Sequence, residues 1–290
     1  MIAKYDILKD KSYPIGEKWS YRIEILDESY LEEFELEIKK TTLFLQNEVL
    51  HIDEIGNTFI KVEFSKMEFD SLPEKLSSFF NKITNLIKKY TLELNKEGQI
   101  IDIHFTEDNF TKEQIDTLHK DEFYKKLSKK EKITINESID KIDKSSYQKD
   151  IKNSLILLFC YPGYFRSGLC DEEALSVHQH NISSNFLQDC FWDINFYMNI
   201  HNITPDGIIN LVCTGFAEDS EKLLNTSLFN KIKEYYNVKE DIYYDYDFQI
   251  MGDYYLCKEN FYIKNAKIQI CELLNEESIE FSKTFIINLV

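Results

Sequence analysis

Residues 160–170 read CYPGYFRSGLC, followed by DEE at residues 171–173 and HQH at residues 178–180. The stretch holds one of the chain's two arginines and two of its eight glycines. Proline and glycine at this density interrupt regular secondary structure. Patterns typical of strands around one helix lie on both sides of it, so we interpret residues 161–190 as a segment that connects two similar halves.

The first half, residues 1–160, contains apolar residues at two different periods. Apolar side chains recur at every second position in five stretches, which predicts β-strands at residues 18–25, 34–45, 60–65, 90–94 and 101–105. A spacing of three and four predicts one amphipathic helix from Ser71, its N-cap, to Ile87. Residues 112–160 also have helical character, which predicts extra helices between the halves.

The second half, residues 191–290, repeats this order. Period-two alternation predicts strands at residues 191–200, 208–213, 241–248, 261–271 and 279–289. A helix is expected from Asp219 or Ser220 to Tyr235. The sequence therefore predicts an α+β fold in which each half is a curved antiparallel β-sheet covered by one amphipathic helix, a tandem structural repeat. The expected domains are residues 1–160 and 191–290, joined by residues 161–190.

This layout of sheet and covering helix is similar to that of lipoprotein carriers, which hold acyl chains in a cavity between sheet and helices. The likeness concerns layout and no sequence motif accompanies it, so it identifies no family. It does supply one functional hypothesis, a carrier of an apolar, lipid-like ligand. The aromatic residues expected on the inner faces fit that hypothesis: Trp19, Tyr21, Phe34, Phe64 and Phe79, then Phe191, Phe196, Phe229 and Phe248.

The charge is strongly negative, with 51 acidic against 34 basic residues and a net charge of −17. The net charge is −7 over residues 1–150 and −10 over residues 151–290. Such a field repels nucleic acid and anionic membranes and attracts basic proteins. Two arginines also leave little capacity for bidentate phosphate recognition. We therefore expect a basic protein partner and no nucleic acid, and the Lys-, Ile- and Asn-rich composition favours a bacterial source.

The sequence predicts a cytoplasmic protein that does not span a membrane. No apolar stretch of signal-peptide length opens the chain, and the longest apolar run, residues 155–161, is too short to cross a bilayer. All six cysteines lie beyond residue 159 without CxxC spacing, so we expect them to be reduced and mostly buried. No cofactor is expected.

Enzyme signatures are scarce. The sequence has no P-loop, GxGxxG, GxSxG or HExxH motif, which removes the commonest nucleotide-binding, hydrolase and protease classes. His178 and His180, with Cys170 nearby, are a candidate metal site, because a His-x-His pair on a strand points both rings to one side. Cys160, Cys170 or Cys190 beside these histidines would be a thiol nucleophile. A metal-dependent enzyme is therefore one alternative.

The strand predicted at residues 241–248, DIYYDYDF, supplies the preferred candidate site. Alternation places Asp241, Tyr243, Asp245 and Asp247 on one face and apolar or aromatic residues on the other. Tyrosines give rigid contact area, and carboxylates accept charge-assisted hydrogen bonds from Arg and Lys of a partner. We assign this face to partner binding.

Two further acids, Glu218 and Asp219, are assigned to the same partner-binding surface. The preferred function is a non-catalytic acidic module for a basic protein, either an immunity protein that blocks a toxin or an adaptor or chaperone for an effector. The alternatives are the apolar-ligand carrier and the metal-dependent enzyme.

Overall fold

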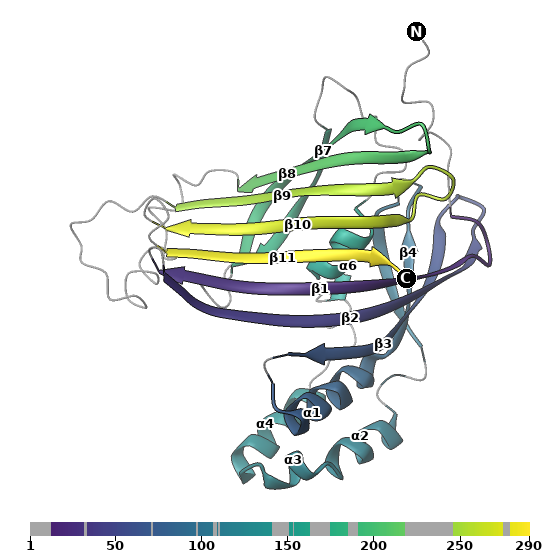
Figure 1. Cartoon of the computed structure of the whole chain (residues 1–290). Helices are drawn as coiled ribbons and strands as arrows, with labels where there is room; N and C mark the ends of the chain where they lie inside the picture. The colour runs from purple at the N-terminus through teal and green to yellow at the C-terminus, as the bar shows by residue number, and fades with distance from the viewer. Residues whose placement is uncertain are drawn as a thin grey trace. The chain divides into compact units, whose positions relative to one another are not determined.

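The computed structural model describes residues 13–31, 34–70, 72–96, 98–106, 109, 111–140, 151–152, 154–162, 175–184, 191–217, 246–274 and 279–290. The strands within them are β1 (Lys18–Leu31), β2 (Phe34–Ile52), β3 (Thr58–Phe69), β4 (Lys89–Leu94), β5 (Ile100–Phe105), β6 (Leu175–Ser183), β7 (Phe191–Ile203), β8 (Ile208–Ala217), β9 (Tyr246–Cys257), β10 (Ile263–Leu274) and β11 (Ile279–Leu289). They form one sheet in the order β5-β4-β3-β2-β1-β11-β10-β9-β8-β7-β6 (Figure 1).

Neighbouring strands from β2 to β5 and from β6 to β11 pair antiparallel. The helices of the described residues are α1 (Glu74–Thr84), η1 (Asn85–Ile87), α2 (Lys112–His119), α3 (Glu122–Lys126), α4 (Lys129–Asp140) and α6 (Leu155–Cys160). The prediction of an α+β fold dominated by antiparallel sheet is confirmed. Among these helices, none combines the length and the apolar character needed to cross a membrane.

Most strands extend beyond the bounds that the sequence patterns predicted, and three elements illustrate the differences. The helix expected from Ser71 begins at Glu74, with Pro73 at the N-cap in an extended conformation. Strand β6 lies inside the predicted connecting segment, and β9 extends to Cys257, beyond the predicted end at Phe248. The helix expected at residues 219–235 falls outside the described residues.

The chain divides into two compact units that interleave along the sequence. The first unit comprises Asp10–Ile23, Thr41–Phe165 and Leu289–Val290, and the second comprises Met1–Lys9, Glu24–Lys40 and Arg166–Asn288. The division therefore cuts through β1 and β2, and residues 24–40 cluster with the second unit. The domain boundaries at residues 160 and 190 stay a prediction.

In the first unit, one face of the sheet is apolar and buried. Ile60 of β3 lies opposite Leu92 of β4, and Val62 lies opposite Tyr90; all four side chains are fully buried. The intervening positions on β4, including Glu93, point to the opposite face. Helices α1 to α4 gather beside β3 in Figure 1.

In the second unit, the core includes a row of buried side chains that crosses five strands. The register aligns the row through Ile200, Leu211, Tyr254, Ala266 and Ile287. Each of these side chains is at most 4% exposed. Burial of one apolar face in this way is what period-two alternation specifies for a sheet that is exposed on its other face. That other face carries the candidate site.

Candidate functional site

Strand β9 alternates between a buried and an outward face. Phe248, Ile250, Tyr254 and Leu256 are buried, at most 1% exposed. The outward positions are Asp247, Gln249, Met251, Asp253 and Tyr255. Met251 is 47% exposed and Tyr255 is 37% exposed.

Strands β7 and β8 add two aromatic side chains to this face. Phe216 of β8 lies opposite Gln249 in the register and is 48% exposed. Its ring stacks on that of Tyr197 of β7, with centroids 5.2 Å apart. Tyr197 and Met251 both lie opposite Thr214, one on each side. We call Tyr197, Phe216, Met251 and Tyr255, with Asp247 and Asp253, the outer β9 surface.

Carboxylates gather at one end of this surface. Asp247 of β9 and Glu280 of β11 lie on opposite sides of Leu273 of β10, and Gln249 donates a hydrogen bond to Asp247. Burial, and then the negative charges of Glu280, Asp247 and Glu28, raise the pKa of the Cys271 thiol to about 11. The three carboxylates that add to the effect of burial come from β11, β9 and β1.

Of the six residues assigned to partner binding, Asp247 is the one that the structure describes. Asp247 lies on the outward face of β9 and Phe248 on the buried face, as the alternation predicts. The others, Asp241, Tyr243, Asp245, Glu218 and Asp219, lie outside the described residues, and the binding role of all six stays a prediction.

Phe216, Met251 and Tyr255 are site residues that the sequence patterns did not single out. Met251 and Tyr255 could have been found by extending the predicted strand, because they occupy odd-numbered positions of β9, as Asp247 does. Among the described residues, that face places Asp247 on the same strand as the exposed side chains of Met251 and Tyr255.

His178 and His180 occupy alternate positions of strand β6. They lie opposite Phe196 and Ile194 of β7 in the register. Cys170 lies outside the described residues, so the metal site at these three residues stays a prediction.

The four described cysteines are free thiols, and three of them are buried. Burial raises the pKa of the Cys160 thiol well above its usual range. Burial, followed by the charge of Asp253, raises the pKa of Cys213 to about 12. The buried environment therefore favours the protonated thiol, which is a poor nucleophile.

A separate hollow of about 580 Å³ lies among the helices of the first unit. Its lining is mostly apolar and comes from α1, α3 with the residue that follows it, and α4: Leu76, Phe79, Phe80, Phe123, Leu127 and Ile135. Phe79 is 4% exposed and packs on Phe123 with ring centroids 5.1 Å apart. Lys130 and Glu131 supply charged groups to the lining. The volume is within the range of small-molecule sites.

No protein-family model and no curated protein matches the sequence. Among solved structures, one of lipovitellin, described as showing lipid–protein interactions, matches with a TM-score of 0.49 and 10% identity. The match covers 96% of this chain and 25% of the lipovitellin chain. DynF from the dynemicin biosynthesis pathway of Micromonospora chersina matches with a TM-score of 0.22 and 6% identity, covering 96% of this chain and 82% of DynF. The chain thus spans a quarter of the lipovitellin chain, and likenesses of this size identify neither a family nor a function.

Proposed function

We propose that the chain is a non-catalytic protein-binding module that docks a basic protein on the outer β9 surface. The observation that carries the proposal is the exposed set of Phe216, Met251 and Tyr255, bordered by Asp247 and Asp253, in a chain with a net charge of −17. The partner would be a toxin that the module blocks as an immunity protein, or an effector that it accompanies as an adaptor or chaperone.

The apolar part of this surface supports docking. Tyr, Phe and Met are enriched at the cores of protein interfaces, and exposed apolar groups that cluster mark interaction sites. Here the side chains project from hydrogen-bonded strands, so binding costs little backbone conformational entropy. Docking would bury Phe216 and Met251, which are now about half exposed.

The acidic part supports selection of a basic partner. Carboxylates at a rim meet Lys and Arg by charge-assisted hydrogen bonds, and the net charge accelerates the encounter. We propose that Asp241, Tyr243 and Asp245 continue this face along the chain and that Glu218 and Asp219 adjoin it. Association should therefore be fast and should weaken as salt screens the charges.

The test is an affinity pull-down from the native host at low and moderate salt, read by mass spectrometry. Wild type should capture a basic protein, and Asp247→Lys with Asp253→Lys should abolish that capture. The matched control is Glu54→Lys with Glu113→Lys, which changes the net charge equally at exposed acids of the first unit. If both double variants lose capture equally, the whole-molecule charge is responsible and the surface is wrongly placed.

A second pair of variants separates apolar contact from charge. Phe216→Ser with Met251→Ser should weaken capture at every salt concentration. Ile55→Ser with Ile133→Ser removes two exposed apolar side chains from the first unit and should leave capture unchanged. Capture of no basic protein by wild type at either salt concentration would reject the function itself.

The hollow among α1, α3 and α4 favours a second candidate function, a carrier of an apolar ligand. Its lining residues come from helices and the residue after α3, whereas the sequence predicted a cavity between sheet and helix. Native mass spectrometry of protein purified from its host should then show a retained lipid-sized mass. Ile135→Trp should expel the ligand by filling the hollow, and Ile133→Trp, an exposed position on the same helix, should not.

We also propose that the two halves are related by structural duplication, each with one covering amphipathic helix, and that the protein is cytoplasmic and bacterial. Alternating buried strands occur in both halves, for example β3 and β9. An experimental structure that superposes residues 18–105 on residues 191–290 with matching strand order would support the duplication. Fractionation of the host cell tests the location.

A further inference from the structure

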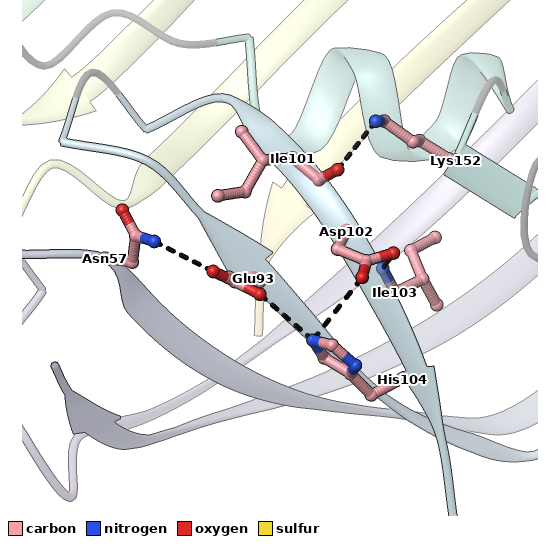
Figure 2. Close-up of polar contacts among 7 residues, drawn as sticks. All are labelled: Asn57, Glu93, Ile101, Asp102, Ile103, His104 and Lys152. Carbon is pink, nitrogen blue, oxygen red and sulfur yellow. Dashed lines mark hydrogen bonds and ion pairs between the residues drawn. The ribbon is translucent and has the colours of Figure 1, made fainter.

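Three side chains with metal-binding atoms converge on the outward face of the first unit. Glu93 lies on β4, and Asp102 and His104 lie on the neighbouring strand β5 (Figure 2). His104 Nε2 is 3.1 Å from Glu93 Oε2 and 3.9 Å from Asp102 Oδ2. All three ligand atoms lie within 4.8 Å of one another.

Each carboxylate is oriented by a separate protein donor. Asn57 Nδ2 donates to Glu93 Oε1 at 2.8 Å, which leaves Oε2 directed at His104. The Ile103 amide donates to Asp102 Oδ1 at 2.8 Å, which leaves Oδ2 directed at the same nitrogen. Figure 2 shows both contacts. Outer hydrogen bonds of this kind orient the ligands of metal sites.

The donor Asn57 is itself fixed in place. Its side chain is buried, and its amide donates to Asp53 Oδ1 at 2.8 Å while its carbonyl accepts from the Asp53 amide at 3.0 Å. The residue that orients Glu93 therefore belongs to a closed turn between β2 and β3.

The strand register places two negative charges face to face. Glu93 lies directly opposite Asp102, an arrangement that destabilises a sheet when nothing offsets the repulsion. A register shift between Glu93 and Leu94 adds Ile101 as an extra residue next to Asp102. Such bulges redirect side chains and are common beside functional sites.

The imidazole ring has a defined orientation. It lies roughly parallel to the ring of Phe59 with centroids 6.2 Å apart, and His51 stacks on Phe59 at 4.2 Å. Among the described residues, His104 has a ring nitrogen within 4 Å of both carboxylates.

The spacing of the three ligand atoms fits one small cation. Donors around a tetrahedral zinc ion with bonds of about 2.1 Å lie roughly 3.4 Å from one another, and the separations of 3.1 and 3.9 Å bracket that value. We propose that Glu93, Asp102 and His104 bind a divalent transition-metal cation of the zinc type. One nitrogen and two carboxylate oxygens suit such an ion better than calcium, which prefers oxygen alone.

The test is isothermal titration calorimetry of the full chain with Zn²⁺, with Co²⁺ absorption as a second readout. Wild type should bind one ion at this site. His104→Ala, or the isosteric pair Glu93→Gln with Asp102→Asn, should lower the affinity at least tenfold. Asn57→Ala should lower it about tenfold by releasing Glu93. Thermal melts of each variant without metal check that the fold persists.

Two controls make the assignment specific. His119 contacts Asn136 on a helix, so His119→Ala should leave the affinity unchanged. His178→Ala with His180→Ala removes the other candidate metal site. Loss of binding in that double variant with retention in His104→Ala would overturn the proposal, as would the absence of Zn²⁺ binding by wild type.

Discussion

Tyr161 donates a hydrogen bond from its hydroxyl to Oδ1 of Asn47 at 2.6 Å, although the two residues are 114 positions apart in the sequence. Both side chains are buried, and Tyr161 immediately follows α6 while Asn47 lies in β2. The bond therefore fixes the end of a buried helix to the sheet of the first unit.

Replacing Tyr161 with Phe should destabilise the protein. The change leaves Asn47 Oδ1 without its donor in a buried position, which costs about 1–3 kcal/mol. Urea unfolding at neutral pH measures the loss. A Tyr161→Phe variant as stable as wild type would contradict a contribution of this hydrogen bond to stability.

Stability should fall at alkaline pH. Burial raises the pKa of Cys213 to about 12, that of Cys271 to about 11 and that of Tyr161 well above its usual 10.0. Above about pH 9 the unfolded chain loses thiol protons that the folded chain keeps, so the free energy of unfolding decreases with rising pH. Chemical unfolding at pH 7, 9 and 10.5 tests this, and a constant unfolding free energy would contradict it.

The thiols should differ in reactivity. In a Cys170→Ser, Cys190→Ser background, Ellman's reagent at pH 8 should modify Cys257 first, because Cys257 is half-buried whereas Cys160 and Cys213 are buried. Mass mapping of the labelled protein identifies the sites. Early labelling of Cys160 in the folded protein would show that α6 opens readily.

Gly252→Ala should destabilise the second unit. A Cβ at this position would lie 2.9 Å from the Lys267 carbonyl oxygen and 3.0 Å from Cys213 Sγ and Ile268 Cα. Two of these neighbours are backbone atoms, so the strands must separate, at a cost of about 1–3 kcal/mol. Thermal unfolding measures the change, and Gln249→Ala, at an outward position of β9, should have a much smaller effect.

Asp121→Ala should loosen the helices around the apolar hollow. Asp121 is the N-cap of α3, accepting from the Phe123 amide at 2.7 Å, and it pairs with Lys82 of α1. Burial acts to raise the pKa of Asp121, but the hydrogen bonds from Lys82 and Phe123 outweigh it and lower the pKa below its usual 3.8.

Loss of this cap should cost about 1 kcal/mol. Because the folded pKa is lowered, the stabilisation is present above pH 3.8 and disappears as the pH falls through the folded value. Asp121→Asn keeps the cap but not the charge, so it should be more stable than Asp121→Ala at pH 7. Equal unfolding free energies for the two variants would rule out the cap as a contributor.

Period-two alternation located most strands of the sheet, since one of their faces is buried. It missed β6, because LSVHQHNIS does not keep apolar residues to one face. It also missed the later part of β9. There the outward positions hold Met251 and Tyr255, large side chains like that of the buried Tyr254. The exposed apolar side chains of the outer β9 surface therefore mask the alternation that marks the other strands.

The cluster of Glu93, Asp102 and His104 could not be located by composition or motif. The turn at residues 95–98 predicts that β4 and β5 pair, but the bulge at Ile101 sets which residues lie opposite each other. Without the bulge, Glu93 would lie opposite Ile101 and the carboxylates would point to different faces. Register irregularities of this kind depend on local geometry that alternation does not encode.

Strand β11 lies between β10 and β1 in the sheet, although β1 is synthesised about 250 residues earlier. At typical elongation rates of 5–20 residues per second, β1 waits roughly 12–50 s on the ribosome before that neighbour emerges. During translation its edge is open to pairing with nascent chains nearby. Because β1 can mispair during this interval, the order of the strands predicts that the yield of folded protein rises with the rate of translation elongation.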